Sequence, residues 1–223
     1  MRFKYKFFVF CLFLIVGSGC ASLSSFQGAK TLNPDESQMG FSLNYFVIPI
    51  NTSGDTSTET KTETITLPSL EFWYRHGLIN SLDMGIKMFP FGMLLDFKYQ
   101  FIALGPFNMA VSAGGDFFMV GFGDERTSFA HIYTPLYISL DAGRKLSVNI
   151  IPKNIVTFAN STSIGGYRAD DLGVGIGISI NSSETFSLIP EVNIYRRVYD
   201  STGIDLDKFP TILYSGLGFA FNF

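Results

Sequence analysis

The sequence has little charge and, beyond residue 30, no long hydrophobic run. A helix that crosses a bilayer needs about 20 consecutive apolar residues, whereas the best uncharged stretch, 99–115, is interrupted by Gln100, Asn108 and a Gly-Pro pair. A membrane protein built of helices is therefore excluded. The net charge of −3 excludes a basic nucleic-acid binder. The presence of only 2 cysteines excludes a disulfide scaffold and a thiolate metal site.

Apolar residues are nonetheless abundant. They make up 47% of the chain, which contains 24 phenylalanines and has a mean hydropathy of +0.26. Disordered chains combine low hydrophobicity with high net charge, so this composition excludes disorder. The apolar character has to be accommodated without a membrane-spanning helix.

Residues 1–19 have the three-part pattern of a secretory signal peptide. Arg2, Lys4 and Lys6 precede an apolar core at 7–16, and small residues follow. This core is too short to span a membrane. Removing the segment takes away basic residues and no acids, which makes the mature chain more acidic.

The end of this segment, Gly-Ser-Gly-Cys at 17–20, resembles the lipobox of bacterial lipoproteins. The resemblance implies that Cys20 becomes the acylated N-terminus. Gly17 departs from the family pattern, which favours Leu or a similar apolar residue there. The alternative is ordinary signal cleavage after Ala21, which discards Cys20. We expect residues 20–38, which are polar and rich in turn formers, to be a lipidated N-terminus and a periplasmic tether.

The rest of the chain, 39–223, shows apolar residues at every second position in segments bounded by turn residues. This pattern is typical of transmembrane barrel strands. It predicts an all-β fold, a closed antiparallel up-and-down transmembrane β-barrel of about ten strands. The strands are expected at 39–50, 63–77, 82–90, 93–104, 107–122, 130–142, 145–159, 171–181, 184–198 and 210–223.

Four prolines fall inside these strands, where each removes a ladder hydrogen bond unless it sits at a bulge. They are Pro68, Pro135, Pro152 and Pro190. We expect local bulges there. Eight strands is the fallback if two of these segments are loops.

The predicted connections alternate in length, as outer-membrane barrels pair short periplasmic turns with longer external loops. The short ones are 79–81, 105–106, 143–145 and 181–184, and the long polar ones are 51–62, 123–129, 160–170 and 199–210. The tight connection at 89–92 is the exception. This alternation places both termini on the periplasmic side.

Periodicity alone does not say which face meets lipid, because a soluble lipocalin-like barrel alternates in the same way. The polar face carries charges of both signs and many glycines, which suit a narrow lumen. We therefore expect apolar side chains outside and a salt-bridged, filled lumen. The predicted lumen charges are Glu71, Arg75, Asp83, Lys87, Asp96, Lys98, Asp116, Asp141, Lys153, Glu191 and Arg197.

The last strand alternates Leu217, Phe219, Phe221 and Phe223 with small or polar residues. It resembles the carboxy-terminal insertion signal of bacterial outer-membrane β-barrels. That signal has a terminal Phe, further aromatics at two-residue spacing and a preceding glycine, here Gly216. The resemblance implies recognition by barrel-insertion machinery.

Ten-stranded barrels include the omptin proteases, which use acidic residues and a histidine at the external rim. His131 is predicted at the outer start of a strand, beside Asp124 and Glu125, and an Asp-Asp pair at 170–171 opens another. The other histidine, His76, falls at the opposite end. The acidic pair and the Asp-His pair of the omptin proteases cannot be matched position by position to residues of this sequence, so we predict no catalytic residue.

The start GCASLSSFQGAKTL resembles that of uncharacterised small barrel proteins described as lipoproteins. The expected protein is thus a small outer-membrane barrel lipoprotein with a structural or surface-interaction role. The alternative is a narrow channel for small solutes or lipid; less favoured are a lipid-anchored lipocalin-like carrier and an omptin-like rim protease. Expected partners are outer-membrane lipid and the barrel-insertion and lipoprotein-sorting machineries. We expect a monomer without nucleic acid, metal or cofactor.

Overall fold

The computed structural model describes residues 23–53, 60–90, 92–122, 125–161, 165–203, 206 and 209–223. The predicted signal peptide and Cys20 lie outside these residues. Within the described part of the chain, no helix is long and apolar enough to cross a membrane.

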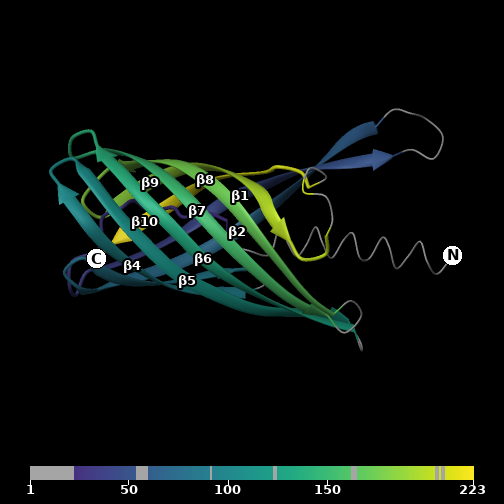
Figure 1. Ribbon diagram of the computed structural model, residues 1–223. Helices are drawn as coiled ribbons and strands as arrows, with labels where there is room; N and C mark the ends of the chain where they lie inside the picture. Colours follow the sequence, from purple (N-terminus) through teal and green to yellow (C-terminus); the bar gives the residue numbers. More distant parts are fainter. Residues whose placement is uncertain are drawn as a thin grey trace.

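The fold is a closed barrel of antiparallel strands (Figure 1). Each strand pairs with its neighbours in sequence, and β10 closes the ring by pairing with β1. The strands are β1 (Ser37–Ser53), β2 (Thr60–Ile79), β3 (Leu82–Phe89), β4 (Gly92–Leu104), β5 (Phe107–Phe122), β6 (Glu125–Asp141), β7 (Leu146–Ser161), β8 (Gly165–Asn181), β9 (Phe186–Asp200) and β10 (Ile212–Asn222). The predicted fold class and the ten-strand count are confirmed.

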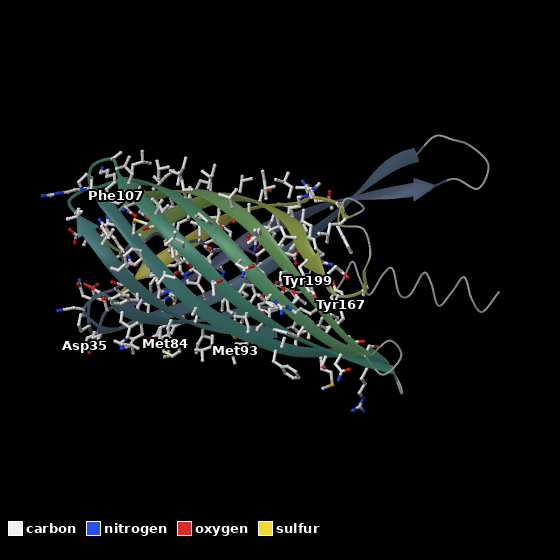
Figure 2. All side chains as sticks on the ribbon, in the orientation of Figure 1. Asp35, Met84, Met93, Phe107, Tyr167 and Tyr199 are labelled. Carbon is white, nitrogen blue, oxygen red and sulfur yellow. The ribbon has the colours of Figure 1, made fainter. Side chains whose placement is uncertain are left out.

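The two ends of the barrel differ in what they carry. The end that we call the turn end has the connections β2–β3, β4–β5, β6–β7 and β8–β9 together with the C-terminus, on the left of Figure 1. The opposite end, which we call the loop end, has the other five connections. In Figure 2, Asp35 and Phe107 mark the turn end, and Tyr167 and Tyr199 lie toward the loop end.

Several strands extend further toward the loop end than the sequence predicted. β6 begins at Glu125 and β8 at Gly165, so most of the loops expected at 123–129 and 160–170 is strand. The prediction ended each strand where apolar alternation stopped. The antiparallel ladder continues past that point because it satisfies backbone hydrogen bonds whatever the side chains are.

The expectation of bulges at the prolines is wrong. Pro68, Pro152 and Pro190 pair in register with Tyr45, Val174 and Leu217, and Pro135 pairs with Lys153. The register shifts lie elsewhere, between Gly77 and Ile79, Gln100 and Ile102, and Asp170 and Asp171. A proline removes one ladder bond without adding a residue, so it leaves the register of the pair unchanged.

Large apolar side chains point outward all around the barrel (Figure 2). On β8, Leu172, Val174, Ile176, Ile178 and Ile180 are 38–55% exposed. Outward aromatic rings also contact each other across strands: the centroids of Phe41 on β1 and Phe219 on β10 lie 4.8 Å apart. The barrel therefore presents a continuous apolar outer surface, which in water would be strongly unfavourable.

The inward face is polar, and a stretch of chain lies against it. Residues 23–33, which we call the lumen segment, have no regular structure, and Leu23, Ser24, Ser25, Phe26 and Ala29 are buried. The segment contacts inward side chains of strands from around the ring, which places it inside the barrel. The tether expected at 20–38 is thus wrong for this part: it is an internal element, stabilised by wall groups that alternation alone did not reveal.

Candidate functional site

The candidate site is the lumen, and its turn-end half contains a network of charges centred on Arg75. This guanidinium on β2 pairs with Asp83 on β3 and donates to Asp96 Oδ1 on β4 at 2.7 Å. Lys98 Nζ lies 3.5 Å from Asp83 Oδ2, and Ser112 Oγ donates to Asp96 Oδ2 at 2.7 Å. All these groups are buried, so each carboxylate has a cationic partner where water is scarce.

A second set of charged pairs lies nearer the loop end, with members on opposite sides of the ring. Lys153 Nζ on β7 lies 3.1 Å from Glu191 Oε1 on β9 and also bonds Asn193. Lys87 Nζ on β3 lies 3.7 Å from Glu71 Oε2 on β2. These pairs flank the lumen segment from two directions.

The first half of the lumen segment is bound mainly through its backbone. Ser25 N and Phe26 N both donate to the Glu191 carboxylate, at 2.7 and 2.6 Å. Lys153 Nζ donates to Leu23 O at 3.0 Å, and Lys87 Nζ donates to Ser24 O at 2.7 Å. The wall therefore supplies an anion to the segment's N–H groups and cations to its carbonyl groups, and such charge-assisted hydrogen bonds are the stronger kind.

Two short side-chain contacts add to this first half. Tyr195 Oη donates to the same Leu23 carbonyl, and Ser24 Oγ donates to Glu71. Glu71 also accepts from Tyr214 Oη at 3.2 Å. The carbonyl of Leu23 is thus shared by a lysine and a tyrosine of two different strands.

The second half of the segment continues the same mode of binding toward the turn end. Ala29 N donates to Ser139 Oγ at 2.7 Å and Leu32 N donates to Asp83 Oδ2 at 3.1 Å. Lys98 Nζ donates to the carbonyl of Lys30 at 2.8 Å. Backbone groups that have no strand partner are satisfied by polar side chains of the wall, as burial requires.

Phe26 is the apolar anchor of the segment. Its ring is fully buried and stacks on Trp73 of β2 with 5.7 Å between centroids. Gly216 and Gly218 of β10 make room for it, because a Cβ at either position would lie 2.7 Å from an atom of the ring. These glycines therefore have a packing function: only a residue without a side chain lets the wall approach the ring so closely.

Cavities remain between the described residues of the lumen segment and the wall, and two of them have a defined lining. The larger, about 190 Å³, opens around the second half of the segment and is lined by Ser139, Ser147, Ser179, Asn181 and Ser187 among others. The smaller, about 40 Å³, lies between the segment and the side chains of Leu94, Tyr133 and Tyr195. The wall and the segment together fill most of the interior and leave a hydroxyl-lined vestibule toward the turn end.

At the loop end, Arg197 contacts a further group of inward side chains. Its guanidinium contacts Asp171 at 3.0 Å, Asp200 at 3.4 Å and the hydroxyl of Tyr167 at 2.6 Å. The ring of Phe209 lies 4.8 Å from it, within cation–π range. This cluster ties β8, β9 and the β9–β10 connection together.

The predicted lumen charges all lie inside the barrel, and all but Asp141 and Arg197 are buried. Asp141 lies near the turn end, where it pairs with Lys30 of the lumen segment at 2.7 Å. Among the predicted insertion-signal residues, Phe219 and Phe221 lie on the outer face with Phe223 exposed at the end, whereas Gly216 faces the lumen. Cys20, the predicted acylation site, lies outside the described residues.

His131 does not lie on the external rim, as the sequence predicted. Its Nδ1 is 2.7 Å from Asp116 Oδ1, Tyr133 donates to the other oxygen at 2.7 Å, and the imidazole stacks on Phe118. His131 is only 2% exposed. A substrate outside the barrel cannot reach this imidazole, so we assign the Asp-His contact to the packing of the wall.

The acidic residues expected near that histidine lie elsewhere. Asp170 pairs with Arg168 at 2.8 Å, whereas Asp171 pairs with Arg197. Asp124 lies outside the described residues. His76 lies at the turn end, where its Nδ1 is 3.0 Å from Ser37 Oγ. Within the described ranges, no group of three or more histidine, cysteine or acidic residues is arranged to hold a metal ion.

The lumen segment itself was missed from the sequence. Its residues show no period-two pattern, and polar, small residues are typical of tethers as well. One signal was available: residues 21–29 contain no charge and are mostly small. Such a stretch suits a lumen crowded with charged side chains, because uncharged residues need no ion-pair partner and small ones leave room for the side chains of the wall.

Comparisons with known proteins find likeness in structure only. No protein-family model matches the sequence, and no curated protein matches it. The outer membrane protease OmpT from Escherichia coli is similar with a TM-score of 0.49 and 10% identity, over 88% of this chain and 100% of that one. Ail of Yersinia pestis has a TM-score of 0.44 and 12% identity, over 85% and 99%.

A third similar structure is an outer membrane channel from Pseudomonas putida F1, with a TM-score of 0.43 and 8% identity over 91% of this chain and 100% of that one. The three differ in role: a protease, an attachment and invasion protein and a channel. At TM-scores below 0.5 and identities of 8–12%, these likenesses establish neither a role nor an enzymatic status for this chain. The antiparallel β-barrel of this chain is established by its own strand pairing.

Proposed function

We propose that the chain is a bacterial outer-membrane β-barrel with a structural or surface-interaction role and a lumen closed by its own N-terminal segment. The observation that carries the proposal is the combination of an apolar outer wall with a filled, charge-paired interior. An apolar exterior suits lipid. A lumen occupied by a bound segment does not suit a permanently open pore.

The proposal includes several points that rest on the sequence. The signal peptide at 1–19 directs export, Cys20 is acylated by the lipoprotein pathway, and Gly216 with Phe219, Phe221 and Phe223 guides insertion into the outer membrane. The barrel acts as a monomer in this proposal; closure of β1 on β10 removes the strand edge through which edge-to-edge association would occur. Outer-membrane lipid is its main partner, and the chain performs no catalysis.

Membrane insertion is tested by fractionation. The full chain with Cys20→Ser lacks the acylation site, so an integral barrel stays in the carbonate-washed membrane and needs detergent for extraction. Its migration on gels should change on heating, because the folded barrel resists detergent until it is boiled. Release of this variant by carbonate would instead favour the soluble, lipid-anchored carrier and overturn the proposal.

A channel is the second candidate, and one observation favours it. The lumen segment is bound by side chains of the wall and forms no strand pairing with it. Displacing the segment would therefore leave the barrel ladder intact and would join the vestibule to the rest of the lumen. In this candidate the segment is a gate.

Planar-bilayer conductance distinguishes the two roles. The native protein is expected to be silent, and a variant that lacks residues 24–32 is expected to give conductance steps, provided that its heat-modified migration shows a folded barrel. Phe26→Ala combined with Glu191→Gln serves as a second variant that loosens the segment without shortening the chain. Steady conductance of the native protein would overturn the closed-lumen role in favour of a channel.

A further inference from the structure

The vestibule at the turn end is an open space between the wall and the second half of the lumen segment. Its volume is about 190 Å³, and a cavity of about 150 Å³ is already large enough to hold benzene. Half-buried amides at the turn-end ends of β1, β8 and β10 form its rim: Gln38, Asn181 and Asn222. A solute of about six to eight non-hydrogen atoms therefore fits the vestibule and can reach it from the turn end.

The wall of the vestibule carries hydroxyl groups that keep hydrogen-bonding capacity. Ser147 Oγ of β7 donates to Asp141 at 2.9 Å and retains its lone pairs as acceptors. Ser187 Oγ of β9 does the same toward Asn181 at 2.7 Å. Ser179 Oγ of β8 accepts from an amide of β7 at 3.0 Å, which leaves its own O–H to donate. Acceptors and a donor thus line one space, and a ligand hydroxyl, which is both donor and acceptor, matches them.

The charged groups that line the vestibule are paired. Lys30 of the lumen segment lies 2.7 Å from Asp141, and Arg75 and Lys98 are balanced by the carboxylates of β3 and β4. An added ion would have to compete with one of these pairs. A neutral ligand leaves all of them intact, so the charge distribution favours an uncharged solute.

The inner end of the vestibule is apolar. Because β9 begins at the turn end, Ile189 lies deeper in the lumen than Ser187, and it is only 4% exposed. The buried ring of Phe26 lines the same end. Ligand sites typically combine apolar surface with a few placed polar groups. Here the C–H groups of a solute can pack against the apolar end while its hydroxyls meet the serines.

We propose that the vestibule is a binding site for a small neutral polyhydroxylated solute, which enters from the turn end and is held by the serine hydroxyls of β7, β8 and β9. One side of the site belongs to the lumen segment, so the site is complete only while the segment is in place. A bound solute therefore stabilises the filled lumen by mass action. In this the inference rests on the proposed closed lumen, but it depends neither on lipid nor on acylation.

Methyl NMR of the full chain tests the proposal. The protein is kept in an amine-oxide detergent, because sugar-based detergents carry the ligand chemistry themselves. With isoleucine methyl groups labelled, Ile189 reports on the vestibule, and the outward Ile176 is the control in the same sample. Titration with erythritol is expected to shift the Ile189 signal saturably in the millimolar range, as suits so small a ligand, and to leave Ile176 unchanged.

Variants assign the binding to the serines. Ser147→Ala combined with Ser187→Ala removes two acceptors and should weaken erythritol binding about tenfold, since two neutral hydrogen bonds together contribute on that order. Ser128→Ala, at the exposed loop end of β6, is the matched control and should leave the affinity unchanged. Heat-modified migration shows whether each variant folds. If the double variant does not fold, Ser179→Met, which fills the vestibule, takes its place and should abolish the shift.

Charged probes test the class of ligand. Phosphate and choline are of similar size, and at matched ionic strength neither should shift Ile189 saturably. The proposal is overturned if either ion binds as tightly as erythritol, if erythritol leaves Ile189 of the folded native protein unshifted, or if the double variant binds as well as Ser128→Ala. A failure to bind erythritol leaves the closed lumen standing as long as the native protein stays silent in planar bilayers, so the two proposals fail separately.

Discussion

Glu191 shows how a single inward side chain can hold the lumen together. Its carboxylate accepts from the backbone of Ser25 and Phe26, from Lys153 and from Asn193. Two of these donors belong to the lumen segment and two to the wall. Because the group is buried, each donor that lost this acceptor would be left unsatisfied in a poorly hydrated space.

We expect Glu191→Gln to destabilise the folded barrel by about 3 kcal/mol, as removing one member of a buried ion pair usually does. The amide keeps the shape but loses the charge that Lys153 and the two backbone donors need. Urea unfolding in lipid or detergent measures the change. Glu184→Gln, at an exposed turn, is the control and should leave the midpoint unchanged.

Glu36, in the turn just before β1, is an exposed carboxylate that also accepts hydrogen bonds, in contrast to the buried Glu191. The side-chain amide and the backbone N–H of Asn33 donate to its carboxylate, at 2.9 and 3.0 Å, and these bonds lower its pKa. A lowered folded-state pKa stabilises this turn above the pKa of the unfolded chain. That stabilisation is lost as the pH falls through the folded value.

We expect Asn33→Ala to raise the pKa of Glu36 toward its ordinary value, because the side-chain donor is the larger cause of the shift. An NMR titration of the labelled carboxyl carbon in detergent measures it. Thr31→Val, which removes a contact to Gln100 only, is the control. An unchanged titration in Asn33→Ala would show that this turn does not form as described.

At this scale the sequence predicted which charges face inward, because alternation assigns every second residue to one face. It did not predict their partners. Arg75 meets Asp96, and Lys153 meets Glu191, only after the register of several strands is set. Such pairs combine residues far apart in the chain, and no local pattern connects them.

At the scale of elements, the lumen segment and β10 fit each other closely. The three heavy atoms nearest to a Cβ added at Gly218 all belong to Phe26, at 2.7–3.1 Å. The sequence suggested a role for the neighbouring Gly216 in insertion. The structure adds that both glycines leave space for an aromatic ring that comes from another part of the chain.

We expect Gly218→Val to destabilise the barrel by about 1–3 kcal/mol through overpacking. In a Phe26→Ala background the same substitution should cost much less, since the ring that it would strike is gone. The double-mutant cycle is read from urea midpoints. Equal costs in the two backgrounds would mean that Phe26 does not pack against β10.

The elements themselves were predictable to different degrees. Ten strands could be read from period-two alternation and turn residues, because one face of each strand is mostly apolar and the other mostly polar or small. The extensions of β6 and β8 could not, since apolar and polar residues do not alternate there. The lumen segment could not either, because it has no repeating geometry that would leave a period in the sequence.

At the scale of the whole molecule, the outer wall decides whether the barrel belongs in lipid. Ile176 lies about five residues from the turn end of β8, which corresponds to roughly half the height of a 25 Å apolar band. Leu104, at the end of β4, lies at the rim and is 69% exposed. Substitutions at these two positions test how the cost of a charged side chain depends on its depth in the bilayer.

We expect Ile176→Arg to destabilise the barrel in lipid by about 2–4 kcal/mol and Leu104→Arg by about 1 kcal/mol or less, following the depth dependence for barrels. Unfolding from lipid vesicles measures both. A soluble barrel would show no such difference, since both side chains would face water. Equal effects would thus count against a membrane location.

The closed ring has a consequence for the order of assembly. Since β1 is bonded to β10 as well as to β2, the lumen segment is enclosed on every side and has no lateral way in or out once this last pairing has formed. The lumen segment therefore either takes its place before the β1–β10 seam closes or enters along the axis of the closed barrel afterwards, so the closing of this seam separates a lateral route of assembly from an axial one.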